Sequence, residues 1–524
     1  MKIQKITLII LGLLFTFRFL QAQPKPVLPY WNCPEEKSKK AQKMDAVLNK
    51  AIEKGPFKPS WESLKNYQVP EWYRDAKFGI FMHWGPETLN FPGKADGTDG
   101  GRTDYKSRAN AFQGEKFDAA NWSKLLHNAG VKYILQVIEH HDAYALYNSS
   151  FTPWSSVRLA PKRDFAKEMS EAARREGLIY GVSSHTEEHY WFYANPPQKI
   201  PPPPQAGRPS QSQPDKEYLD TWQRRITEMV EKYKPQLFYF DWCIEQPAYE
   251  PYMQRFASYF YNRSLKWKQE VVLNYKYKAM PEGTAVKAIS VYSGQRAAWE
   301  TQGASPLPWQ FDGMSSNAWF WKPNIRPYPA GNIICDMVDV VSKNGNYVMN
   351  ITPDTDGLPG PEQEKLLQEI GQWISVNGEA IYGTRPWTVF GEGPTHGMNP
   401  SFNGVAAQSP LSPGNPNYSG QNIFTAQDIR FVKKGEALYI LVMAIPTADI
   451  RITSLGKSSP VSERTITKIS LLGSGEQLKW KQDKDALIIE KPSRMPCEYV
   501  LAFKIEFEKL ENGKESKFRI SPGI

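Results

Sequence analysis

Residues 236–242 read QLFYFDW, a short apolar run that ends abruptly in an acidic residue. Six other apolar segments resemble it, and amphipathic stretches separate them. They cover residues 77–84, 131–138, 178–184, 270–275, 286–292 and 346–351. Strands that alternate with helices predict a parallel sheet covered by helices. The number of units favours an α/β fold of the (β/α)-barrel type. A doubly wound open sheet is the alternative, but no GxGxxG follows the first strand.

The amphipathic stretches predict the helices of this barrel. They cover residues 117–130, 164–177, 216–234, 251–267, 331–343 and 361–377. The last one begins at Pro361, and Asn377-Gly378 can end it, as is common at helix termini. We therefore expect a catalytic barrel over residues 61–390, preceded by a helical lead-in over residues 23–60.

The pattern changes after about Gly391. Residues 393–420 are rich in Gly, Pro, Ser and Asn, which predicts a connecting loop. Short runs typical of strands follow. They cover residues 437–443, 449–454, 465–471, 486–489 and 499–505. The sequence therefore predicts a small C-terminal β-sandwich over residues 391–524.

The first 22 residues have the features of a secretory signal peptide. Lys2 and Lys5 precede an apolar run at residues 6–17, and Ala22 offers a small residue for cleavage. The run is shorter than the roughly 20 residues that a membrane-spanning helix needs. We expect an exported, periplasmic or secreted protein without a membrane span.

Charge and cysteine content exclude several classes of protein. The formal net charge is +9, but no Lys/Arg block concentrates it, which argues against nucleic-acid binding. The four cysteines are Cys33, Cys243, Cys335 and Cys497. None of them forms a CxxC pair, which argues against a zinc or thioredoxin-type site. Their possible disulfide pairing stays open.

Polar residues gather where the predicted strands end, which is where barrels carry their sites. Five of the seven histidines, at positions 83, 140, 141, 185 and 189, follow the first three strands. Asp241 follows the fourth. A buried carboxylate without a partner is costly, so Asp241 is either functional or held by a salt bridge or a helix cap.

The chain is 13% aromatic, with 17 Trp and 26 Tyr, and aromatic faces suit carbohydrate surfaces, although a large aromatic core is the alternative explanation. If the ligand is a sugar and Asp241 is the nucleophile of a retaining glycosidase, a second carboxyl group must lie about 5–5.5 Å from it. Two downstream candidates are Glu300, beside Trp299, and Asp312. Partial desolvation by the tryptophan would raise the pKa of Glu300, as a proton donor requires. An ordinary loop carboxylate is the alternative interpretation for both.

Residues 185–189, HTEEH, match the H-x-x-E-H pattern of some zinc peptidases. That chemistry needs both histidines on one helix. Here the motif directly follows a strand and runs into YWFY at residues 190–193. We therefore expect neither a metal nor a cofactor.

Residues 72–85, WYRDAKFGIFMHWG, resemble the opening strand of the α-L-fucosidases of glycoside hydrolase family 29. Other segments resemble, in order, the family's second strand, last barrel unit and start of the C-terminal sandwich. They are residues 129–142, 344–353, 377–384 and 429–439. The similarity covers roughly residues 60 to 445, so it is more specific than any single motif.

The resemblance implies an exo-acting, retaining α-L-fucosidase whose partner is a fucosylated oligosaccharide or glycoconjugate. Asp241 falls on the family's nucleophile, and Glu300 best matches its acid/base residue. Three histidines are expected to bind sugar hydroxyls and two tryptophans to shape the pocket: His83, His140, His141, Trp84 and Trp242. Arg296 lies close to Glu300 and could orient a carboxylate.

The chain departs from the family pattern near the paired histidines. Glu139 stands where the family usually has Lys, and Ala143-Tyr144 where it has Gly-Phe. Residues 93–108 lack the usual Glu-Trp-Tyr. We expect Glu139 to alter the electrostatics of the pocket. An exo-glycosidase for another sugar, such as an α-L-galactoside, and a glycan-binding protein with a degenerate site stay open. So does the oligomeric state.

Overall fold

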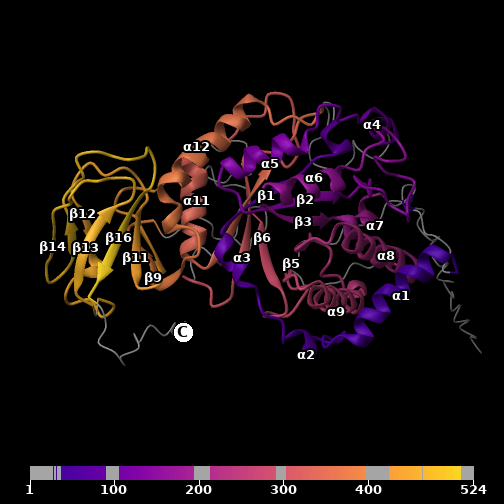
Figure 1. Cartoon of the computed structure of the whole chain (residues 1–524), viewed down its shortest axis with the longest axis horizontal. Coiled ribbons are helices and arrows are strands. Elements are labelled where there is room, and N and C mark those ends of the chain that lie inside the picture. Colours follow the sequence, from indigo (N-terminus) through magenta and orange to yellow (C-terminus); the bar gives the residue numbers. More distant parts are fainter. Residues whose placement is uncertain are drawn as a thin grey trace, which may run out of the picture.

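The computed structural model describes residues 28, 31, 37–89, 105–193, 213–290, 303–395, 424–462 and 464–508. Within them the chain forms a closed parallel barrel followed by two antiparallel sheets (Figure 1). The predicted barrel with a C-terminal β domain is therefore confirmed, and the open-sheet alternative is wrong.

Eight parallel strands close the barrel in chain order. They are β1 (Phe78–Met82), β2 (Tyr133–Glu139), β3 (Ile179–Ser184), β4 (Leu237–Phe240), β5 (Val272–Lys276), β6 (Val286–Ser290), β7 (Trp309–Met314) and β8 (Gly345–Ile351). The sheet closes because β8 pairs with β1. Seven of these strands match predicted segments. The eighth, β7, contains Asp312, so the interpretation of Asp312 as a loop residue is wrong.

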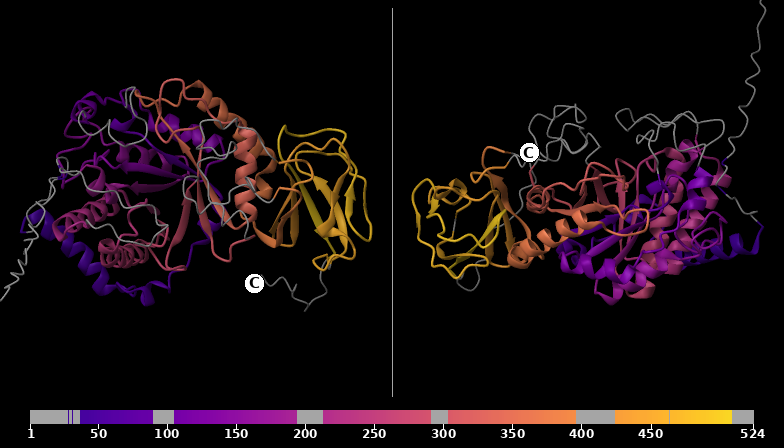
Figure 2. Two further views of the ribbon diagram at one scale, coloured as in Figure 1. Left: turned by 180° about the vertical axis from the view of Figure 1, so that it is seen from behind. Right: turned by 90° about the horizontal axis from the view of Figure 1, so that it is seen from above.

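Helices surround the strands in all three ribbon views (Figures 1 and 2). They are α1 (Lys39–Lys54), α2 (Trp61–Leu64), α3 (Glu71–Ala76), α4 (Tyr105–Ala111), α5 (Ala119–Asn128), α6 (Phe165–Arg175), α7 (His189–Phe192), α8 (Lys216–Tyr233), α9 (Glu250–Trp267), α11 (Ala330–Ser342) and α12 (Pro361–Asn377). Side-chain oxygens of Asp118, Asp164 and Asp215 accept backbone N–H groups at the starts of α5, α6 and α8. Such N-caps fix where these helices begin.

Each strand packs one face into the barrel and the other against the helices. In β1, Phe81 belongs to the interior cluster, whereas Ile80 and Met82 belong to the cluster between strands and helices. The interior also holds Tyr133, Leu135, Val137, Leu237, Tyr239, Val272, Val286, Ala288 and Val348. Bulky side chains fill the barrel, so the polar ends of the strands are the accessible part.

Two antiparallel sheets form the C-terminal β-sandwich. The larger has the order β13 (Ile466–Leu471), β16 (Leu501–Phe507), β11 (Ala437–Val442), β10 (Ile429–Lys434) and β9 (Arg385–Glu392). The smaller has the order β12 (Ile450–Ile452), β15 (Leu487–Ile489) and β14 (Trp480–Gln482). Isoleucines, leucines and phenylalanines of both sheets share a second core. The larger sheet begins with β9 at Arg385, so this strand crosses the predicted domain boundary at residues 390/391.

Helices α11 and α12 lie between the barrel and the sandwich (Figures 1 and 2). A buried ion pair joins the two parts, since Arg430 Nε of β10 lies 2.6 Å from Asp339 Oδ1 of α11. Both side chains are almost fully buried. The sandwich is therefore fixed to the helical layer of the barrel.

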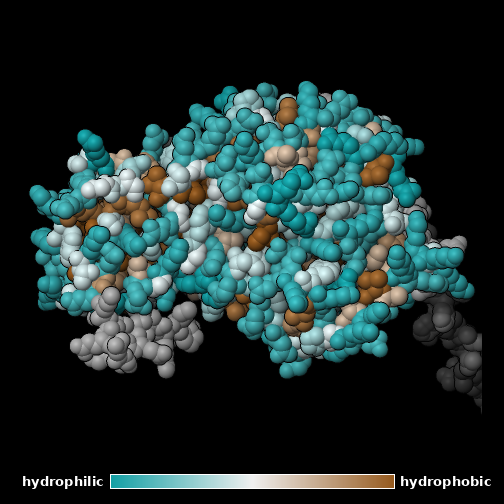
Figure 3. Space-filling view, viewed as in Figure 1, coloured by the Kyte–Doolittle hydropathy of each residue, from teal (hydrophilic) through white to brown (hydrophobic). Residues whose placement is uncertain are grey.

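The visible surface is mostly hydrophilic, with apolar side chains in small scattered groups (Figure 3). Among the described helices, none combines the length and apolar character needed to cross a bilayer. Cys243, Cys335 and Cys497 are free thiols. Cys33 lies outside the described residues.

Candidate active site at the carboxyl end of the barrel

Asp241 directly follows β4, and side chains from neighbouring strands hold its carboxylate. His185 Nδ1, after β3, lies 2.9 Å from Asp241 Oδ2. Lys276 Nζ, at the end of β5, contacts Oδ1. The backbone N–H of Asp241 donates to Glu187 Oε1 at 2.8 Å. The carboxylate is thus charge-compensated and fixed in orientation, while 13% of the side chain stays exposed.

The surroundings of Asp241 stabilise its ionised form. Burial acts to raise the pKa of Asp241, but Lys276 and His185 outweigh it and hold that pKa well below its usual value. Lys276 also faces Asp312 Oδ2 at 3.8 Å. An ionised, oriented and partly accessible carboxylate can act as a nucleophile.

Four histidines converge beside Asp241: His83, His140, His141 and His185. His83 Nδ1 lies 2.7 Å from Asn350 Oδ1, and the His140 and His141 rings stack with centroids 3.9 Å apart. Burial, followed by neighbouring imidazoles, lowers the pKa of His83 and of His140 well below the usual value. The same causes lower the pKa of His141 to about 3. A neutral imidazole has one donor and one acceptor, which suits sugar hydroxyls.

Another carboxyl group, that of Glu188, belongs to the same cluster. Glu188 lies in the turn η2 (Thr186–Glu188), and its Oε2 contacts His141 Nε2. Burial and the charge of Asp241 raise the pKa of Glu188 well above its usual value. Ligand atoms of His141, His185, Glu188 and Asp241 all lie within 4.8 Å of one another. They could surround a cation, but the Lys276 ammonium already contacts Asp241.

The HTEEH segment does not have the geometry of a zinc-peptidase motif. It forms a 3-10 turn followed by the short helix α7. His185 faces Asp241, whereas His189 Nδ1 lies 2.6 Å from the His141 carbonyl oxygen. Among the described residues, His189 joins neither group of close potential metal ligands. The two histidines of the motif therefore have different partners.

Sequence comparison assigns the chain to a family. The family model described as alpha-L-fucosidase matches residues 45–379, and the model of the alpha-L-fucosidase C-terminal domain matches residues 421–506. The chain belongs to the α-L-fucosidase family. It is therefore a glycoside hydrolase by family, and the resemblance seen in its motifs is confirmed.

Individual relatives agree with this assignment. Tissue alpha-L-fucosidase of Bos taurus is 25% identical over 486 residues, covering 86% of this chain and 91% of the relative. The Homo sapiens counterpart is 26% identical over 477 residues, with the same coverage. The crystal structure of Thermotoga maritima alpha-fucosidase has a TM-score of 0.67 at 23% identity. The aligned region covers 86% of this chain and 100% of the Thermotoga maritima chain. At this identity the likeness supports the fold alone.

The two tryptophans predicted to shape the pocket of this α-L-fucosidase family member lie near it in different ways. Trp84 Nε1 donates to the Asp354 carbonyl at 2.8 Å, and its ring stacks on Phe117. It also lines a small pocket that includes His140 and Phe320. Trp242 is half-buried and meets Phe192 edge-on. Their contact with a sugar stays a prediction.

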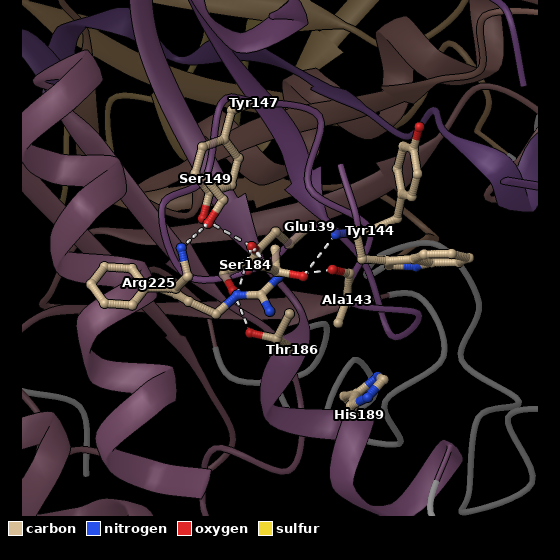
Figure 4. A network of polar contacts seen from close by, with 12 residues as sticks. Glu139, Ala143, Tyr144, Tyr147, Ser149, Ser184, Thr186, His189 and Arg225 are labelled. Atoms are coloured by element: carbon tan, nitrogen blue, oxygen red, sulfur yellow. Dashed lines mark hydrogen bonds and ion pairs between the residues drawn. The ribbon is translucent and has the colours of Figure 1, made fainter. Parts of the chain in front are cut away.

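Glu139 does not charge the pocket, contrary to expectation. Its Oε1 accepts hydrogen bonds from Arg225 Nε at 2.9 Å, Arg225 Nη2 at 2.6 Å and the Tyr147 hydroxyl at 2.9 Å (Figure 4). Neither charged side chain is exposed. The Arg225 guanidinium therefore neutralises the carboxylate that replaces the family's Lys.

Glu300 and Asp312 are the two candidates for the second catalytic carboxyl group. Glu300 and Arg296 lie outside the described residues, so their predicted roles stay predictions. Asp312 is buried, and it accepts hydrogen bonds from the Tyr239 hydroxyl at 2.6 Å and from Gln310 Nε2 at 2.9 Å. Asp312 thus has donors of its own and shares Lys276 with Asp241.

Sequence reasoning missed two residues of this site. Lys276 ends β5 as Glu139 ends β2, so its position at a strand end was a usable signal. Glu188 belongs to the HTEEH segment, which was interpreted only as a possible zinc-peptidase motif. His185 and Asp241 were both expected at the rim. Their contact with each other becomes clear only in the closed barrel, where β3 lies beside β4.

Proposed function

We propose that this protein is an exo-acting, retaining α-L-fucosidase that releases terminal α-L-fucosyl residues from glycans. The observation that carries the proposal is the state of Asp241, an ionised carboxylate held by Lys276 and His185 with part of its side chain accessible. Membership of the α-L-fucosidase family supports the choice of sugar.

The reaction is a double displacement. The Asp241 carboxylate attacks the anomeric carbon and forms a covalent fucosyl-enzyme, while an acid/base carboxyl group protonates the departing oxygen. The same group then deprotonates a water molecule, which attacks the anomeric carbon and restores Asp241. Neutral His83, His140 and His141 hydrogen-bond the sugar hydroxyls. Family resemblance supports Glu300 as the acid/base residue.

The first test measures nitrophenol release from an aryl α-L-fucoside by the wild type and by Asp241→Ala. We expect turnover by the wild type and a loss of several orders of magnitude in the variant, with an unchanged circular dichroism spectrum. Asp356→Ala, an exposed aspartate that pairs with Lys116 on the surface, serves as the control. Near-normal activity of Asp241→Ala would refute the nucleophile assignment. Sugar binding by a wild type without turnover would instead establish a binding protein.

The acid/base assignment has its own test. Glu300→Ala should lose most activity on poor leaving groups and regain part of it with azide or an activated aryl leaving group. Absence of both rate loss and rescue would move the role to another carboxyl group.

Export is a separate part of the proposal. It rests on the basic, apolar and small-residue pattern of residues 1–22. Amino-terminal sequencing of protein expressed in a secreting host should give a start near Gln23. An intact Met1 on protein retained in the cytoplasm would contradict export.

A further inference from the structure

We propose that Glu188 is a positioning residue that acts through His141 on a hydroxyl group of the bound sugar. The inference rests on the proposed function, because it requires a fucoside in the pocket. It adds to the reaction a carboxyl group that the double displacement itself does not use.

Glu188 is buried, and its carboxyl oxygens have fewer hydrogen-bond donors than they can accept. Its side chain has no exposure, and its Oε2 contacts His141 Nε2. Within the described part of the chain, neither carboxyl oxygen accepts another hydrogen bond. Burial of such a group is costly, so the His141 imidazole, which its Oε2 contacts, is the place to look for its role.

Exposure separates the two members of this pair. The His141 side chain is 19% exposed, whereas that of Glu188 is completely buried. A ligand can therefore reach the imidazole but not the carboxyl group behind it. A carboxyl group bound to one ring nitrogen determines the ring orientation and the nitrogen that carries the proton. Because Nε2 faces Glu188, Nδ1 of His141 is the atom available to a ligand.

The residues next to Glu188 hold His141 from other sides. His189 Nδ1 lies 2.6 Å from the His141 carbonyl oxygen. The Phe192 ring lies 4.5 Å from the His141 ring, centroid to centroid. The His140 ring stacks on the His141 ring at a centroid distance of 3.9 Å. The segment 188–192 thus fixes both the backbone and the ring of His141. Such preorganisation lets a hydrogen bond form without reorganisation.

The position of His141 identifies the part of the sugar that it meets. Ligand atoms of His141, Glu188 and Asp241 lie within 4.8 Å of one another. In the proposed arrangement the imidazole meets the 2-hydroxyl of the sugar, which is the hydroxyl group on the carbon next to the one that Asp241 attacks. Hydrogen bonds to this hydroxyl strengthen in the oxocarbenium-like transition state. Loss of Glu188 should therefore lower kcat more than it raises KM.

Complete burial also distinguishes Glu188 from an acid/base residue. A proton donor must reach the oxygen of the departing group. The Glu188 carboxyl lies behind His141 and has no exposure, so it influences the sugar only through the imidazole.

The test combines variants with a deoxy substrate. We compare Glu188→Ala and Glu188→Gln with the wild type on an aryl α-L-fucoside and on its 2-deoxy analogue. Glu188→Ala should lower kcat/KM on the parent substrate by about 10- to 100-fold, mainly through kcat. The loss should be several-fold smaller on the 2-deoxy substrate. Glu188→Gln should recover part of the rate, because its amide can still bind Nε2.

Glu245→Gln provides a matched control. Glu245 is a half-buried residue after β4. Its Oε1 accepts from Gln246 Nε2 at 3.3 Å, and within the described part of the chain no hydrogen bond or ion pair joins it to His141. Its effect should be equal on both substrates. An equal loss on both substrates with Glu188→Ala would overturn the proposal, because a general structural role does not depend on the 2-hydroxyl.

A second readout does not depend on turnover. The ¹⁵N shifts of the His141 side chain should report a different proton distribution between Nδ1 and Nε2 in Glu188→Leu than in the wild type, because a leucine side chain cannot hydrogen-bond Nε2. An unchanged His141 signal would overturn the proposal even if Glu188→Ala fails to fold. A wild type that turns over no fucoside would refute the proposed function, while the ¹⁵N measurement would still decide the role of Glu188.

Discussion

Two carboxylate–cation pairs occupy the ends of barrel strands, and they differ in exposure. Glu139 at the end of β2 binds Arg225, and both side chains are fully buried. Asp241 after β4 binds Lys276, and 13% and 11% of these side chains are exposed. A closed pair can only support its surroundings, whereas an open pair can meet a substrate. The same chemical groups therefore serve as scaffold in one place and as reactive site in the other.

The closed pair supports the loop that carries the pocket histidines. Arg225 Nη2 donates to the Ala143 carbonyl at 2.8 Å (Figure 4), and the Arg225 guanidinium lies over the Trp31 ring at 4.6 Å. Ala143 has φ 58°, in the left-handed region that favours glycine. The hydrogen bond from Arg225 thus holds a strained residue just after His140 and His141.

The largest expected effect comes from opening the closed pair. Arg225→Met leaves the Glu139 charge buried without its cation, so the free energy of unfolding should fall by about 3–5 kcal/mol. Urea unfolding followed by circular dichroism measures this change. The double variant Glu139→Leu/Arg225→Met should regain most of the stability, because it removes both charges together. A stable single variant would show that water or another group compensates Glu139.

A smaller effect is expected from the open pair, and it appears in the pH profile. Lys276→Met removes the cation that holds down the pKa of Asp241, so that pKa should rise by about 1–3 units. Since the ionised carboxylate is the nucleophile, activity is lost as the pH falls through this pKa. The acidic limb of kcat/KM should therefore move to higher pH.

Lys278→Met is the control for this measurement, since it removes a lysine two residues further along the chain. Its acidic limb should coincide with that of the wild type. An unshifted acidic limb in Lys276→Met would mean that His185 alone keeps Asp241 ionised.

Local sequence patterns predicted most of the barrel but not all of its strands. Apolar runs such as those around β2 and β4 are recognisable because they are buried on both faces. Strand β7 reads WQFDGM, and its Asp312 and Gly313 resemble a turn when their partners are unknown. In the closed barrel, Tyr239 and Gln310 bind the Asp312 carboxyl, which makes a carboxyl group tolerable inside a strand.

The candidate site shows the same division. Asp241 and the histidines were predictable because each follows an apolar run, and the carboxyl ends of barrel strands share one rim. Their partners were not, because they come from other elements. Arg225 on α8 is 86 residues from Glu139, and no local pattern joins them. Expectations about charge near the pocket fail wherever such a distant partner neutralises it.

The smallest expected effect tests whether Asp312 belongs to the scaffold or to the chemistry. Asp312 is almost fully buried and shares Lys276 with Asp241. Asp312→Asn keeps the shape and most hydrogen bonds but removes a charge, so kcat/KM should fall by about tenfold, or roughly 1.4 kcal/mol. If Asp312 only tunes Lys276, the loss should be the same for activated and poor aryl leaving groups, and azide should restore nothing. A loss confined to poor leaving groups, with azide rescue, would instead make Asp312 the proton donor and displace Glu300.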